Sequence, residues 1–400
     1  MSKANYRRTP FLVVFPDSSA ARDTYGGTGE NVALEGHLLR PETESDTAIV
    51  FMHPIGGGAY LPMTNALARA GHHVVYCNSR YRGVDSALIM EKVVEDLGAC
   101  IRYTKEKLGY DKVVLAGWSG GGSLSTFYQA QAENPTVTAT PAGEGPDLTA
   151  LELIPADGLM LLAAHVSRHE TLTEWMDASI LDESDPSRRD PELDLYDPAN
   201  PNQPPYTEEF VQRYRAAQIA RNRRITAWVK GKLAQVRASG RPHDEFAFVV
   251  HGTMADPRWL DPGLDPNDRV PGTCYLGDPQ TVNMSPVGLA RFSTLRSWLS
   301  QWSYDEANAD GVRAAADVTV PVLVIGNTAD DACTPSHTRR LYEGFTSTEA
   351  EFYEVQGATH YYAGPDQRDH LADALDRIES WLAGNGWVAE TTANEEYPHG

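Results

Sequence analysis

The sequence is poor in cysteine, and its cysteines follow no metal-binding pattern. The chain of 400 residues contains four of them, at widely separated positions: Cys77, Cys100, Cys274 and Cys333. This spacing matches neither a disulfide framework nor a known metal motif. We therefore expect buried, reduced structural thiols, with no metal site and no cofactor.

Long apolar runs are also missing. No stretch approaches the roughly 20 apolar residues that a membrane-spanning helix needs. The first apolar run, at 11–15, ends at Pro16 and Asp17 and is too short for the core of a signal peptide. These absences predict a protein without a membrane span, located in the cytoplasm.

Basic residues are outnumbered by acidic ones. Lysine and arginine number 34, aspartate and glutamate 55, and the net charge is −21. Such a charge repels the phosphates of nucleic acids and anionic membranes, and it argues against either as the main partner. Hydrophobic residues make up 41 % of the chain, which is an ordinary balance for a globular protein.

Short apolar runs alternate with helical periodicity in two parts of the chain. The predicted buried strands are 47–52, 72–78, 112–118, 158–166, 320–327 and 350–356. Between two of them, residues 90–108 place their apolar side chains on one helical face, and a final helix follows Pro365. This alternation predicts an α/β fold with a mostly parallel central sheet flanked by helices.

The alternation is interrupted by a long insertion. We expect residues 1–167 and 316–400 to form the two parts of one core, with residues 168–315 inserted between them as an α-helical cap. Within the insertion, the proline- and aspartate-rich stretch 182–205 predicts an irregular belt with a solvated surface. A second helix of the insertion is expected to begin at Pro286.

The other helix of the insertion, 207–240, is long and basic. Thr207 is its predicted N-cap, and the segment carries eight basic residues up to Arg237. Such a run is usually a solvated helix face. The alternative is a cationic wall beside a pocket for an anionic substrate, in which Arg221, Arg223 and Arg224 would meet phosphates.

A glycine-rich stretch, KVVLAGWSGGGSLS at 112–125, contains the strongest chemical signal. Ser119 lies between a predicted strand and a predicted helix, with Gly117 and Gly121 two positions away on either side. A sharp strand-to-helix turn needs small residues at those positions, and it presents the serine hydroxyl as a nucleophile at the helix N-terminus.

A serine nucleophile needs a base and an acid that orients the base. His360 follows the strand at 350–356 and is the predicted base. Asp330, which follows the strand at 320–327, is the preferred acid, and its neighbour Asp331 is the alternative. A similar phrase within the insertion offers a second, less favoured pair, His251 and Asp256.

Two backbone donors are expected to hold the oxyanion. The Gly120 N–H is one of them. The other should come from the loop HPIGGG after the strand at 47–52, where Pro54 lacks an N–H, so that Ile55 or, second, Gly56 would donate. His53 is expected to make a structural hydrogen bond at the strand end.

The phrases FMHPIGGG, GWSGGG, IGNTADD and GATH, in this order, resemble the α/β-hydrolase superfamily, in its serine esterase or lipase-like form. The resemblance covers 31–167 and 316–384, and the insertion stands where that family carries its cap. It implies acyl transfer through an acyl-enzyme on Ser119. The chain departs from many members in having HP where they have HG, which leaves the second oxyanion donor open.

The expected reaction is hydrolysis of a carboxylic ester or lactone with a hydrophobic part. The alternatives are an acyl-CoA thioesterase, a C–C bond hydrolase or peptidase on the same fold, and a ligand-binding module without catalysis. The sequence leaves the substrate and a homo-oligomeric state open. Five aromatic residues of the insertion are either packing residues of the cap or the lining of an acyl pocket: Trp175, Tyr206, Trp228, Trp259 and Trp302.

Overall fold

The computed structural model describes residues 5–17, 31–56, 58 and 61–388. Their main sheet has eight strands in the order β1-β2-β4-β3-β5-β6-β9-β10. β2 pairs antiparallel with β1 and β4, and the other neighbours are parallel. The strands are β1 (Tyr6–Pro16), β2 (Asn31–Pro41), β3 (Thr47–Phe51), β4 (His73–Cys77), β5 (Lys112–Ser119), β6 (Gly158–Ala164), β9 (Val322–Asn327) and β10 (Ala350–Val355).

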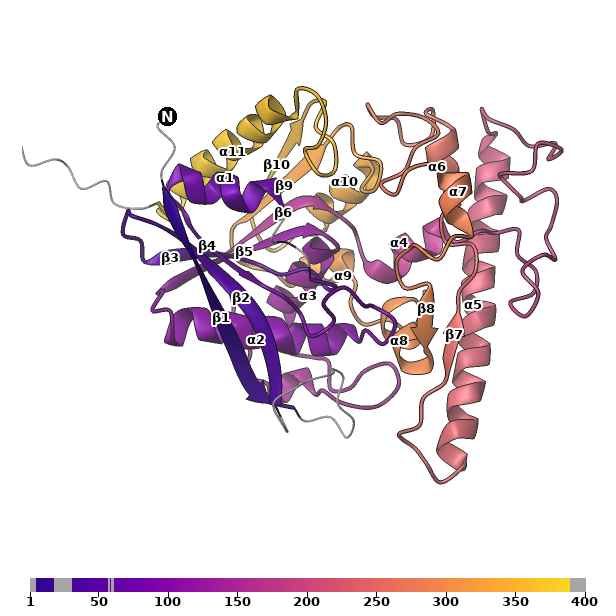
Figure 1. Cartoon of the computed structure of the whole chain (residues 1–400), viewed down its shortest axis with the longest axis horizontal. Coiled ribbons are helices and arrows are strands. Elements are labelled where there is room, and N and C mark those ends of the chain that lie inside the picture. The colour runs from indigo at the N-terminus through magenta and orange to yellow at the C-terminus, as the bar shows by residue number, and fades with distance from the viewer. Residues whose placement is uncertain (1–4, 18–30, 57, 59–60, 389–400) are drawn as a thin grey trace, which may run out of the picture.

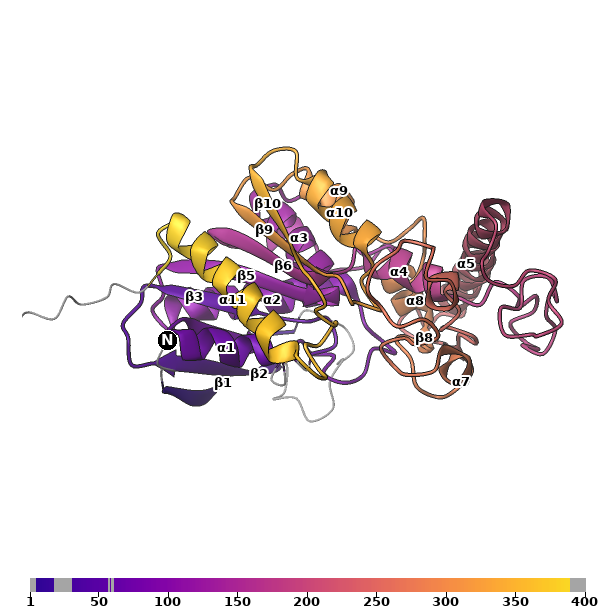
Figure 2. The same ribbon diagram turned by 90° about the horizontal axis from the view of Figure 1, so that it is seen from above.

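Helices cover both faces of this sheet (Figures 1 and 2). One face carries α1 (Pro62–Ala70) and α11 (Gln367–Gly384). The other face carries α2 (Met90–Glu106), α3 (Gly120–Glu133), α9 (Gly311–Ala315) and α10 (Pro335–Gly344). The predicted α/β class, with a mostly parallel sheet between helical layers, is therefore confirmed.

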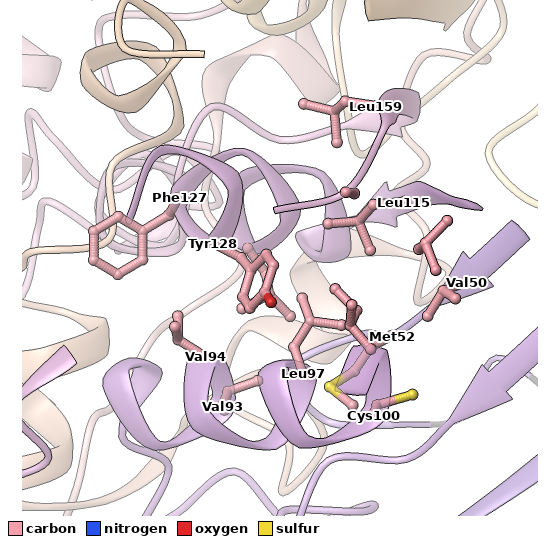
Figure 3. Packing of buried hydrophobic residues seen from close by; sticks show 14 of the residues in the cluster. Val50, Met52, Val93, Val94, Leu97, Cys100, Leu115, Phe127, Tyr128 and Leu159 are labelled. Atoms are coloured by element: carbon pink, nitrogen blue, oxygen red, sulfur yellow. The ribbon is translucent and has the colours of Figure 1, made fainter. Parts of the chain in front are cut away.

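The larger core lies between the sheet and the helices α2 and α3. Figure 3 shows Val93 and Leu97 of α2 packed below Tyr128 of α3, with Leu115 of β5 and Val50 of β3 beside them. All five side chains are buried. Their burial removes apolar surface from water at about 25 cal/mol per Å², and it holds β5 and α3 in the orientation that the turn between them requires.

The predicted strands and helices of the core are present, and β1 and β2 are added at one edge. The run at 11–15, which is too short for a signal peptide core, lies in β1. There Val13 is buried while Leu12 and Val14 are more than half exposed, as expected for a strand with one face in solvent.

The segment between β6 and β9 contains most of the remaining elements. They are α4 (Arg168–Trp175), α5 (Glu208–Ala238), β7 (Ala247–Val249), α6 (Pro257–Leu260), α7 (Pro279–Asn283), β8 (Phe292–Thr294) and α8 (Leu295–Gln301). A short 3₁₀ turn, Leu148–Ala150, precedes β6. α5 begins as predicted, because the Thr207 side chain accepts the Phe210 N–H.

The helix predicted from Pro286 is wrong in its first half. α8 begins only at Leu295, and Phe292–Thr294 form the strand β8, which pairs with β7. Gly288 and Ala290 have positive φ angles of 144° and 50°, which a right-handed helix does not contain. The Ala290 N–H donates instead to Asp85 Oδ2, at 2.7 Å.

The stretch 182–205 has no helix or long strand, as predicted. Its aspartates accept the backbone N–H two residues further on, and this repeated turn explains the composition. These aspartates are Asp182, Asp185, Asp190, Asp194 and Asp197. The four cysteines are free and buried, and within the described ranges no helix is long and apolar enough to cross a bilayer.

Candidate active site

Ser119 lies at the turn between β5 and α3, with a φ angle of +54°. This is a strained conformation for a residue with a side chain, and close backbone packing maintains it. A Cβ on Gly117 would lie 2.6 Å from Gly122 Cα, and one on Gly121 would lie 2.7 Å from the carbonyl oxygen of Met52. The glycines flanking Ser119 are therefore required by space, as the sequence predicts.

His360 lies beside Ser119, although 241 residues separate them in the chain. It follows β10 and precedes α11, and its Nε2 is 3.1 Å from Ser119 Oγ. Its carbonyl oxygen accepts a hydrogen bond from Trp118 Nε1, and the Trp118 and His360 rings are 4.6 Å apart. The residue next to the serine thus holds the histidine loop in place.

Asp330 rather than Asp331 lies against this histidine. Asp330 Oδ2 is 2.7 Å from His360 Nδ1, while Oδ1 accepts the N–H groups of Ala332 and Cys333, both at 2.7 Å. The neighbouring Asp331 contacts Trp259, whose Nε1 donates to its carbonyl oxygen. Burial and the adjacent Asp330 raise the pKa of Asp331 to about 6.

The three groups form one chain of contacts in a site that excludes most water. Ser119 is 7 % exposed, His360 3 % and Asp330 0 %. At such burial, charge–charge and charge–dipole interactions are much stronger than in water. An imidazole that gained a proton from Ser119 would face the Asp330 carboxylate directly, so that proton transfer from hydroxyl to imidazole is favoured by this arrangement.

The loop after β3 differs from the expected oxyanion arrangement. The Ile55 N–H donates to His53 Nδ1 at 3.3 Å, and the Gly56 N–H donates to the His53 carbonyl oxygen at 2.9 Å. Both backbone donors proposed for this loop are therefore engaged within it, and His53 makes its expected structural hydrogen bond. Gly120 is the first residue of α3, so its N–H has no partner within the helix.

His165 is a residue of the site that the sequence analysis missed. It follows β6, next to β5 in the sheet, and its N–H donates to the Ser119 carbonyl oxygen at 3.2 Å. Its ring lies 6.4 Å from that of His360 and 5.4 Å from that of Trp175. Burial, with smaller effects from neighbouring histidines, holds the pKa of His165 well below its usual value. Its place at the same sheet edge as Ser119 is the signal that could have revealed it.

The segment between β6 and β9 touches the acid loop through buried charged groups. Arg258 binds Glu174 and Asp256, and its Nη1 donates to Thr334 Oγ1 at 3.0 Å. Asn267 Nδ2 donates to the carbonyl oxygen of Asp330 at 2.8 Å. This network fixes the backbone on either side of the Asp330 carboxylate, and no single sequence motif indicated it.

The less favoured pair, His251 and Asp256, is not brought together at the site. Asp256 is buried and forms ion pairs with Arg215 and Arg258. His251 lines a groove of about 620 Å³ on the outer side of the segment, together with Trp228, which is 45 % exposed. Neither residue contacts Ser119.

The basic helix does not form a cationic wall beside the site. Figures 1 and 2 show α5 at the end of the molecule opposite β1. Most of its basic residues are paired with acidic ones, among them Arg221 and Arg224 with Glu183, Arg223 with Asp305, Lys230 with Glu306, and Arg237 with Glu144. These pairs neutralise the charge that a phosphate group would need.

Four of the five aromatic residues of this segment are packed in its own cores. Trp175, Trp259 and Trp302 belong to one buried cluster, and Tyr206 belongs to a second. Trp175 also contacts His165, which places it near Ser119. The interpretation as packing residues is thus supported for most of them, and Trp175 is the one that borders the site.

Three side chains of a kind that can bind a metal ion lie close together at this site. They are Asp330, Cys333 and His360, and their possible ligand atoms all lie within 4.8 Å of one another. Two of these groups are already bonded to each other, through Asp330 Oδ2 and His360 Nδ1. Burial also raises the pKa of the Cys333 thiol well above its usual value. Metal ions bind cysteine as the thiolate, which is the form that burial of Cys333 disfavours when no ion is bound.

Comparisons with known proteins agree with this architecture. Residues 47–139 match the family model described as the alpha/beta hydrolase fold, and no curated protein matches the chain. The siderophore hydrolase EstB from Aspergillus fumigatus is similar over 92 % of this chain and 99 % of its own, at 12 % identity and a TM-score of 0.50. The alpha/beta hydrolase GrgF from Penicillium sp. sh18 is similar over 94 % and 99 %, at 11 % identity and a TM-score of 0.50.

At these identities the structural likeness concerns the fold alone. The family match covers β3 to α3, which includes the turn that carries Ser119. Sheet order, helical layers and the matched segment agree, and the chain has the α/β-hydrolase fold.

Proposed function

We propose that this protein is a serine hydrolase that cleaves a carboxylic ester or lactone through an acyl-enzyme on Ser119. The observation that carries the proposal is the chain of contacts from Ser119 Oγ to His360 Nε2, at 3.1 Å, and from His360 Nδ1 to Asp330 Oδ2, at 2.7 Å. A nucleophile, a base and an orienting acid in this order are what acyl transfer requires.

In the first half of the reaction, Ser119 Oγ attacks the carbonyl carbon while His360 Nε2 takes the hydroxyl proton. The carbonyl π electrons move to the oxygen, which the Gly120 N–H stabilises. The Ile55 N–H reaches this oxyanion only if it leaves His53 Nδ1. Collapse of the tetrahedral intermediate breaks the ester C–O bond, and His360 gives the proton to the leaving oxygen.

In the second half, water attacks the acyl carbon and His360 takes one of its protons. The Ser119–acyl bond breaks, the proton returns to Ser119 Oγ, and the carboxylic acid leaves. Asp330 orients the imidazole in both halves and stabilises the imidazolium that forms in each. These steps balance with the described residues, the ester or lactone and one water molecule.

We further propose that residues 168–315 act as the cap that selects the substrate. Two hydrogen bonds support this role, from Asn267 to the Asp330 carbonyl oxygen and from Trp259 to that of Asp331. Trp175 offers an apolar surface beside His165. A substrate with a hydrophobic part fits such a lining. An acyl-CoA thioesterase is less favoured, because the arginines of α5 that would bind its phosphates are ion-paired.

Covalent labelling tests this proposal without knowledge of the natural substrate. A fluorophosphonate probe is expected to modify the folded protein at one position, and peptide mass spectrometry should find the adduct on Ser119. The heat-unfolded protein is the control, since its serine lacks the base and the oxyanion donor. Failure of the folded protein to react, or reaction at another residue, would contradict the assignment.

A further inference from the structure

We propose that the imidazole of His53 donates the second hydrogen bond to the oxyanion through its Nε2–H, in place of a backbone N–H of its loop. The inference rests on the proposed function and assigns one further catalytic residue to the same site. It starts from a shortage of donors: Pro54 has no N–H, and the N–H groups of Ile55 and Gly56 are engaged within the loop.

The bond from Ile55 fixes the tautomer of the ring. His53 Nδ1 accepts the Ile55 N–H at 3.3 Å, so Nδ1 carries a lone pair and the proton of the neutral ring lies on Nε2. Burial, and then electrostatic interactions with Arg168 and His360, lower the pKa of His53 to about 3. The ring is therefore uncharged at neutral pH and presents Nε2 as a donor.

The free nitrogen lies next to the residue that carries the other donor. A Cβ placed on Gly120 would be 3.0 Å from His53 Nε2, closer than the 3.6 Å to Cε1, the next ring atom. Gly120 is also the residue whose N–H opens α3. The two donors therefore lie near each other at Gly120, the residue after Ser119, and a side chain at position 120 would press on His53.

His53 Nε2 makes no hydrogen bond to any residue that the structure describes. The residue is only partly buried, so Nε2 is free to bond a ligand. A substrate oxyanion between Gly120 N and His53 Nε2 would satisfy it. The same oxyanion would receive two preorganised donors, which is the arrangement that stabilises a tetrahedral intermediate.

The loop holds the ring rigidly enough for this role. The Gly83 N–H donates to the Ile55 carbonyl oxygen at 2.8 Å, and Ser79 Oγ donates to the Pro54 carbonyl oxygen at 2.5 Å. The His53 ring also lies 5.9 Å from that of Trp118. A donor on a fixed loop needs no reorganisation when charge develops on the substrate.

Two substitutions separate catalysis from loop structure, because each keeps one function of the ring. In His53→Gln the side-chain amide extends far enough to donate near the position of Nε2. In His53→Asn the shorter amide places its oxygen near Nδ1, where it can still accept the Ile55 N–H. With p-nitrophenyl butyrate, His53→Asn is expected to lose about 10²–10³-fold in kcat with KM nearly unchanged, and His53→Gln to stay within about tenfold of the parent.

The affinity for phenylboronic acid is a second measurement, and a purely structural role of His53 in the loop would not change it in this way. Its tetrahedral adduct on Ser119 carries an oxygen in the place of the oxyanion, so His53→Asn should weaken it by a factor similar to the loss in kcat. Equal losses in the two variants, or a fully active His53→Asn, would overturn the inference. Fluorophosphonate labelling of Ser119 reports separately on the proposed function, which stands if labelling occurs and only the His53 result fails.

Discussion

Replacing Ser119 with alanine is expected to lower kcat for p-nitrophenyl esters by about 10⁶-fold, the scale of losing a serine nucleophile from an acting triad. The reason is specific to covalent catalysis. Without Oγ no acyl-enzyme forms, and His360 can only assist direct attack by water in a site where Ser119 is 7 % exposed. Steady-state kinetics with a detection limit below about one part in 10⁶ of the parent activity would measure the effect.

Ser125→Ala provides a matched control for that experiment. Ser125 is a buried serine of α3, the helix that begins after Ser119, and its Oγ has no hydrogen-bond partner among the residues that the structure describes. Its removal should leave both activity and melting temperature nearly unchanged. If Ser119→Ala kept the parent turnover while folding normally, the nucleophile would have to be sought elsewhere.

Asp330→Asn is expected to lower kcat by about 10⁴-fold with little change in folding, because it leaves the triad histidine in the wrong tautomer. The hydrogen bonds of Asp330 determine this tautomer. Its Oδ1 accepts two backbone N–H groups, so an asparagine would keep its oxygen there and turn its NH₂ toward His360. His360 Nδ1 would then have to accept, its proton would move to Nε2, and Nε2 could no longer take the proton of Ser119.

Asp331→Asn is the matched control and has its own pH signature. Activity should stay within a few fold of the parent, because Asp331 does not bond to His360. The raised pKa of Asp331, about 6 against about 3.9 for a free side chain, means that the folded state holds this proton more tightly than the unfolded state. The charged form therefore costs stability once the pH exceeds both values.

The substitution is thus expected to raise the free energy of unfolding at pH 8 by about 3 kcal/mol. The gain should shrink as the pH falls from 6 and vanish below about pH 4, where aspartate is protonated in both states. Denaturant unfolding at pH 4 and pH 8 would measure it. A large loss of activity in Asp331→Asn, with Asp330→Asn active, would exchange the roles of the two residues.

The central sheet and the site at the ends of its strands could be predicted because each strand is recognisable from its own short stretch of sequence. Strands rich in valine and isoleucine end at one edge of a parallel sheet, and Ser119, Asp330 and His360 each follow such a strand. The choice between Asp330 and Asp331 could not be made in this way. Neighbouring residues of a loop point in different directions, and here the bonds from the N–H groups of Ala332 and Cys333 decide which carboxylate faces His360.

The segment between β6 and β9 was predicted less well because distant contacts shape it. The expected start of a helix at Pro286 failed, since Ala290 donates to Asp85, about 200 residues away, and β8 pairs with β7. The charge of α5 left two interpretations open for the same reason: its arginines meet acidic residues from other loops. The sequence shows how many charged residues α5 carries, but their ion-pair partners are known only from the fold.

Mass spectrometry of the trapped intermediate tests the central claim most directly. The protein would be mixed with excess p-nitrophenyl acetate, quenched in acid within milliseconds and digested. The account predicts a burst of p-nitrophenol close to one equivalent and an added acetyl group on the peptide that contains Ser119, absent from Ser119→Ala. An acetyl group that forms on another residue as fast as turnover would contradict the account. Turnover with neither a burst nor an adduct would also contradict it, if a variant with slowed deacylation gives the same result.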